Sequence, residues 1–186
     1  MSDREEAARA QLRARQGAGA RYDHFSAPHV DLSLARQGTA YFARLLMNMT
    51  DEQLSAPSRA PGISRREIVA RVGLEARFLA ETVAWVRVRS DQPLPIDQSV
   101  VPSEVDFIST LPSQALRNLF SHSEVHLNVE WRDLDAEGWN TIITDRSGRP
   151  FPIDTTPRLR AHSIWHNACQ LGLSSRVADI PKELRD

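Results

Sequence analysis

The sequence has a single cysteine, Cys169, among its 186 residues. One cysteine excludes an internal disulfide and any zinc site built from several cysteines. No apolar run approaches the roughly 18 residues that a membrane-spanning helix needs. The N-terminus also lacks the apolar core of a secretory signal. We therefore expect a protein of the reducing cytoplasm with no part in a membrane.

Neither sign of charge dominates the composition. Lys and Arg number 23 against 24 Asp and Glu, which gives a formal net charge of -1 and a pI of about 6.6. A nucleic-acid-binding domain would carry a basic patch or a much higher pI. The balance of charge therefore argues against a nucleic-acid partner, and the length suits one domain with a sizeable core.

Apolar residues recur at three- and four-residue spacing in several stretches, which is typical of amphipathic helices. Ser64 and Glu67 form an S-x-x-E capping box at the start of one of them. Asp31 or Ser33 would cap another. The fold class predicted is all-α, an antiparallel four-helix bundle. The predicted helices cover residues 30–49, 64–89, 113–134 and 156–173.

The segments between and before these helices are predicted to be irregular. Residues 1–27 are rich in Ala, Arg, Gln and Gly and read as an N-terminal arm, either peripheral or disordered. Residues 93–102 read as an extended linker between prolines. Residues 139–153 are predicted to form a small β-hairpin that turns at Ser147 and Gly148. The domain is thus expected to span residues 28–186.

The last predicted helix carries two polar stripes. His162, His166 and Cys169 fall at i, i+4 and i+7, on one face. Ser163, Asn167 and Gln170 have the same spacing and form a second stripe, rotated by one residue. Two histidines four apart can bind one zinc ion, although such a site needs a third ligand. The alternative is a pair of solvated or packed histidines. Candidates for the third ligand are Cys169, Glu67, Glu75 and His122.

Two further residues are candidates for chemistry. Cys169 would be a nucleophile if its pKa were depressed, but a small buried hydrophobe is the preferred interpretation. Arg71 would clamp a carboxylate if it pointed inward, whereas a solvent-facing Arg paired with Glu75 is commoner. Ordinary surface or packing roles suit the polar residues of the third helix, namely Arg117, His122 and His126.

Several motifs carry a family resemblance, and together they span about residues 32–181. The chain resembles the N-terminal, DinB-like four-helix-bundle domain of mycothiol-dependent maleylpyruvate isomerases. In that family a smaller C-terminal domain usually follows, so its share of a substrate pocket would be absent here or supplied by a partner. DinB-like bundles also often form homodimers. The motifs are 32–39 (LSLARQGT), 61–65 (PGISR, where the family favours G-W-T-R), 115–119 (ALRNL), 122–123 (HS), 129–132 (VEWR) and 172–181.

The resemblance implies a particular chemistry and also a departure from it. Family members bind one zinc ion through a His of helix two and a Glu and a His of helix four. The metal activates the thiol of mycothiol, which adds to the cis double bond of maleylpyruvate and yields fumarylpyruvate after rotation. Carried over by position, these ligands fall on Arg71, Ser163 and Asn167, all poor zinc ligands. His162 and His166 lie one residue out of register, roughly 100° around the helix.

The expected function is therefore a cis-trans isomerase acting on maleylpyruvate or a similar unsaturated keto acid in aromatic-compound catabolism, without zinc. Arg71 and Cys169 are the predicted catalytic residues, and a low-molecular-weight thiol is a second source of the transient adduct. One alternative is a metal-dependent DinB-like thiol transferase that uses His162 and His166. Another is a non-catalytic binding protein. The substrate carboxylate is predicted to contact Arg71, Ser163, Asn167, Gln170 and His122.

Overall fold

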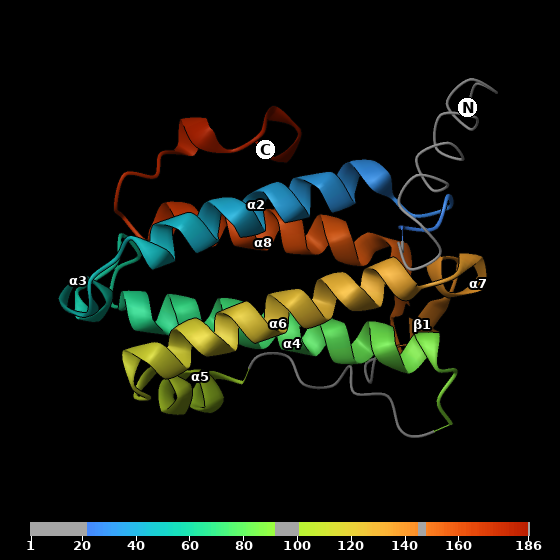
Figure 1. The fold of residues 1–186 in the computed structure, drawn as a ribbon, viewed down its shortest axis with the longest axis horizontal. Coiled ribbons are helices and arrows are strands. Elements are labelled where there is room, and N and C mark those ends of the chain that lie inside the picture. Colours follow the sequence, from blue (N-terminus) through green and yellow to red (C-terminus); the bar gives the residue numbers. More distant parts are fainter. Residues whose placement is uncertain (1–21, 92–100, 145–147, 186) are drawn as a thin grey trace.

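The computed structural model describes residues 22–91, 101–144 and 148–185, and its long helices form an antiparallel bundle (Figure 1). The predicted helical fold is confirmed. Of the predictions above, most of the N-terminal arm, most of the 93–102 linker and the Ser147 side of the turn lie outside the described residues. The long helices are α2 (His29–Met47), α4 (Arg65–Arg87), α6 (Ser113–Asp133) and α8 (Thr156–Gln170).

Helix α4 begins where the capping box predicted. The Ser64 side chain accepts a hydrogen bond from the Glu67 backbone N–H, and Glu67 Oε2 accepts one from the Ser64 backbone N–H at 2.6 Å. The cap predicted for the first helix is wrong. Helix α2 starts one turn earlier, after Pro28, with no side-chain cap, so Asp31 lies within its first turn.

Short elements connect the long helices, and the sequence patterns missed most of them. Thr50 and Gln53 form a capping box for α3 (Asp51–Ser55), and a proline at the first turn opens α5 (Pro102–Ser109). Helices this short have too few residues to show a period. The predicted hairpin is present after α7 (Ala136–Trp139), as β1 (Ile142–Thr144) paired antiparallel with β2 (Pro150–Pro152).

The core lies between two helix pairs, α4 with α6 and α2 with α8. Helices α2 and α8 approach closely at Gly38, where an added Cβ would lie 2.5 Å from Ile164 Cγ2. Trp165 then donates its indole N–H to the Leu34 carbonyl at 3.1 Å, which fixes the register of these two helices. No helix of the described residues is long and apolar enough to cross a membrane.

The C-terminal segment, residues 173–185, returns along α2 and α8 (Figure 1). It contains the short helical turns η3 (Val177–Asp179) and η4 (Lys182–Leu184). Tyr41 of α2 donates its hydroxyl to Asp179 at 2.7 Å, and Arg158 of α8 donates to the Glu183 carbonyl. These bonds hold the segment against the bundle, so it forms one wall of the cavities described next.

Candidate functional site

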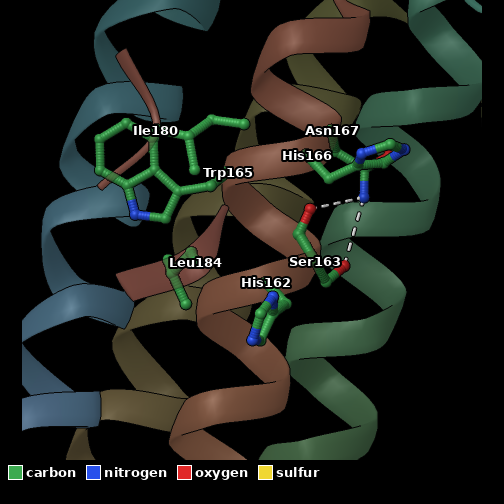
Figure 2. Close-up of a pocket in the computed structure, with 7 residues that line it drawn as sticks. All are labelled: His162, Ser163, Trp165, His166, Asn167, Ile180 and Leu184. Carbon is green, nitrogen blue, oxygen red and sulfur yellow. Dashed lines mark hydrogen bonds between the residues drawn. The ribbon is translucent and has the colours of Figure 1, made fainter. Parts of the chain in front are cut away.

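A cavity of about 370 Å³ lies between α8 and the C-terminal segment, and we call it the α8 cavity. Figure 2 shows its polar side chains on α8 and two apolar ones, Ile180 and Leu184, from the C-terminal segment. It therefore offers a polar wall facing an apolar one, as small-molecule sites commonly do. Its lining residues on α8 are His162, Ser163, Trp165, His166 and Asn167.

The two polar residues that the sequence placed at the site, Ser163 and Asn167, are hydrogen-bonded to each other. Asn167 Nδ2 donates to the Ser163 carbonyl at 2.9 Å and to Ser163 Oγ at 3.2 Å (Figure 2). Ser163 Oγ in turn donates to Glu75 Oε2 on α4 at 2.5 Å. The hydrogens of both side chains are thus engaged within the protein.

Behind this wall lies a buried ionic network that the sequence analysis missed. Arg160 is completely buried and bonds two carboxylates, Glu75 at 2.7 Å and Glu124 of α6. Glu124 also accepts the Thr39 hydroxyl of α2 at 3.1 Å. Burial lowers the pKa of the Arg160 guanidinium, an effect that Glu75 opposes. The network therefore links all four long helices behind Ser163.

A signal for this network was present in the sequence. Arg160 precedes Ile164, Ala168 and Leu171 at the spacing of one helix face, and that face is buried. A charged residue on an apolar stripe requires a buried partner. Its partners come from other helices, however, so no local pattern identified Glu75 and Glu124.

Arg71, the predicted carboxylate clamp, is exposed on α4 and does not line the α8 cavity. Its level along the bundle follows from the contact between Glu75 and Ser163. Arg71 lies one turn before Glu75 on α4, and Asn167 lies one turn after Ser163 on α8. Because the two helices run antiparallel, Arg71 and Asn167 are at the same level along the bundle (Figure 1). The structure describes no hydrogen bond or ion pair for the Arg71 guanidinium.

The two histidines of the alternative reading both line the cavity. His162 is half-buried, and the structure describes no hydrogen bond for its ring. His166 is exposed, and its Nε2 accepts a 2.6 Å hydrogen bond from the Gln170 side-chain amide. Among the described residues, no group of three His, Cys, Asp or Glu side chains gathers with the geometry of a metal site.

The remaining predicted residues lie elsewhere. Cys169 and Gln170 line a neighbouring cavity of about 560 Å³. Burial, and then the charge of Asp179, raise the pKa of the Cys169 thiol, whose Sγ also donates to the Arg176 carbonyl at 3.4 Å. These features disfavour a reactive thiolate. His122 is exposed on α6, away from both cavities.

Residues 35–168 match the family described as the mycothiol maleylpyruvate isomerase N-terminal domain, which is well over half of the chain. The chain belongs to this family. The resemblance predicted from sequence is thereby confirmed. A comparison with curated proteins found no match.

Among solved structures, the chain is similar to the mycothiol-dependent maleylpyruvate isomerase, and to a mutant of that enzyme with one histidine replaced by alanine. In both cases the TM-score is 0.75 and the sequence identity 29%. The match covers 84% of this chain and 65% of the isomerase chain. The chain thus spans less than two thirds of the length of that enzyme.

The residues at the three positions to which the sequence resemblance assigns the family's zinc ligands do not fit a zinc ion. Arg71 is a cation, Asn167 uses its amide hydrogens on Ser163, and the Ser163 hydroxyl donates to Glu75. Zinc requires thiolate, imidazole or carboxylate ligands. A site at these positions would have to disrupt the bonds that hold Ser163 to α4.

Proposed function

We propose that this protein is a cis-trans isomerase that binds a small unsaturated keto acid in the α8 cavity and needs no zinc ion. Membership of the maleylpyruvate isomerase family supports the reaction class. The observation that carries the proposal is the cavity itself. It opens over Ser163 and Asn167, where the resemblance places the family's reacting centre, and those positions hold neutral hydrogen-bonding side chains.

The cations around the cavity are the groups available to hold the substrate carboxylate. Ser163 and Asn167 already use their hydrogens, so they form a fixed polar wall rather than the primary anion ligands. His162 on the cavity wall and Arg71 on α4, at the level of Asn167, have no hydrogen bond in the described structure. A guanidinium binds a carboxylate through two parallel hydrogen bonds, which would orient the double bond toward α8.

The isomerisation itself would proceed through reversible addition of a thiol supplied from solution. His162 takes the thiol proton, and the thiolate forms a C–S bond at the double bond while the electron pair moves into the keto acid as an enolate. Arg71 stabilises that negative charge. After rotation about the resulting single bond, the enolate expels the thiolate, which recovers its proton from His162. We assign no nucleophilic role to Cys169, because its pKa is raised.

The test uses untagged protein with maleylpyruvate, with and without a low-molecular-weight thiol and with a metal chelator. Fumarylpyruvate is measured by chromatography. We expect thiol-dependent turnover that the chelator leaves unchanged. His162→Gln and Arg71→Gln should each lower kcat/KM by about 10- to 100-fold, as the loss of one electrostatic or proton-transfer group does. Matched controls are His126→Gln on α6 and Arg77→Gln on α4, both exposed and outside the cavity.

A metal-dependent thiol enzyme is the second candidate, because both His162 and His166 line the α8 cavity. Metal content decides between the two. One equivalent of a transition metal that is lost when both histidines become Gln, together with chelator-sensitive turnover, would replace the metal-free proposal. Substrate binding without turnover under any thiol would instead assign a non-catalytic binding role.

A further inference from the structure

The larger cavity, which we call the C-terminal groove, lies beyond the α8 cavity along the same helix. Its walls come from the 59–61 loop before α4, the end of α8 and the C-terminal segment. Its volume of about 560 Å³ is within the range of small-molecule sites. It is lined by Arg59, Ala60, Pro61, His166, Cys169, Gln170, Val177, Ile180, Leu184 and Arg185.

Most of this lining is apolar, and its charged members are cationic. Pro61, Val177, Ile180 and Leu184 supply aliphatic surface, and Val177 remains 67% exposed in the described structure. A concave surface lined mainly by apolar side chains with a few polar groups is typical of ligand sites.

Arg59 and Arg185 flank the groove without a carboxylate partner in the described residues. Arg59 donates to the Ser175 carbonyl at 2.8 Å, and Arg185 donates to the Ile180 carbonyl at 2.7 Å and to the Ala178 carbonyl at 2.6 Å. Carbonyls are neutral, so no described partner cancels the positive charge of either guanidinium. Among the described residues no Asp or Glu lines the groove, and the neighbouring Asp179 is already bonded to Tyr41 and Arg176.

We infer that the C-terminal groove binds an apolar monoanion, namely an aliphatic or aromatic carboxylate, with its body on the aliphatic wall and its charge at the two arginines. Transfer of the apolar body from water to the aliphatic wall is favourable. The two guanidiniums, which have no described carboxylate partner, would balance the charge of the anion. The groove shares His166, Ile180 and Leu184 with the α8 cavity, so its ligand lies directly beside the proposed isomerisation site.

The assay measures binding rather than activity, so its outcome is independent of the proposed reaction. Octanoate is titrated calorimetrically, and octan-1-ol serves as the uncharged match. The only thiol of the chain, Cys169, reports the location, because it lines the groove. We expect octanoate to bind, to slow the reaction of Cys169 with a thiol reagent, and to bind at least tenfold more tightly than octan-1-ol.

Variants locate the site further. Val177→Glu places a carboxylate on the aliphatic wall and should weaken octanoate binding about tenfold or more, the equivalent of 1.4 kcal/mol. The control is Val125→Glu, since Val125 is 63% exposed on α6, outside the groove. Arg185→Gln should weaken octanoate but leave octan-1-ol unchanged. Both valines are exposed, so the fold should tolerate these changes, which circular dichroism verifies.

Three results would overturn this inference. Equal octanoate binding by Val177→Glu and wild type would place the ligand elsewhere. Equal binding of octanoate and octan-1-ol would remove the anion requirement. A dimer in which Cys169 is protected and octanoate has no effect would assign the groove to a second copy of the chain.

Discussion

The substitution Arg160→Met tests the buried network most directly. The Arg160 side chain is fully buried, and its partners Glu124 and Glu75 retain 9% and 25% of their side-chain exposure. Met has a similar length and no charge, so it leaves Glu124 as a buried carboxylate with the Thr39 hydroxyl as its remaining described partner. Removing one member of a buried ion pair costs about 3–5 kcal/mol.

That cost should be measurable by urea unfolding and by thermal melting. For a chain of this size each kcal/mol lowers Tm by about 2–4 °C, so the expected fall is roughly 6–20 °C. The matched control is Arg77→Met, which breaks the exposed pair with Glu81 and should cost at most about 0.5 kcal/mol. A second variant, Arg160→Met with Glu124→Leu, should recover most of the loss because it removes the uncompensated charge as well.

The network would have no structural importance if Arg160→Met cost less than about 1 kcal/mol, close to the surface-pair control. Additive losses in the double variant would show that Arg160 and Glu124 do not interact. Either result would mean that the four helices are held by apolar packing alone, and that Ser163 does not depend on the charges behind it.

Three further predictions concern the frame around the cavities. Burial and the hydrogen bond to Asp179 raise the pKa of Tyr41 to about 12. The contribution of this group to stability is therefore complete below about pH 10 and is lost as the pH rises toward 12. Ultraviolet titration should show one tyrosine that ionises near pH 12, and Tyr41→Phe should abolish that step. Gly38→Ala should destabilise the fold by about 1–3 kcal/mol in urea, because its Cβ would collide with Ile164 of α8; an unchanged midpoint would mean that the helices can separate there at no cost. Ser64→Ala removes the α4 cap and should cost about 1 kcal/mol by the same measurement, while Ser64→Thr should retain most of it.

Family, helical class and the positions of the long helices could all be predicted from the sequence. These properties are local, or are spread over many positions, so each long helix shows its period within its own residues. The capping box at Ser64 is one example, since both partners lie within four residues. The replacement of the family's zinc ligands at Arg71, Ser163 and Asn167 stays a prediction, because it rests on the sequence motifs alone.

Only the tertiary structure determined which of the candidate residues share a cavity. His162 and Asn167 lie on neighbouring stripes of one helix, yet both line the α8 cavity, because the C-terminal segment covers that side of α8. His122 is on a different helix and faces solvent. The pairing of Arg160 with Glu75 and Glu124 joins residues 85 and 36 positions apart. Contacts between distant segments depend on how the helices pack, and no periodic pattern within a single helix records them.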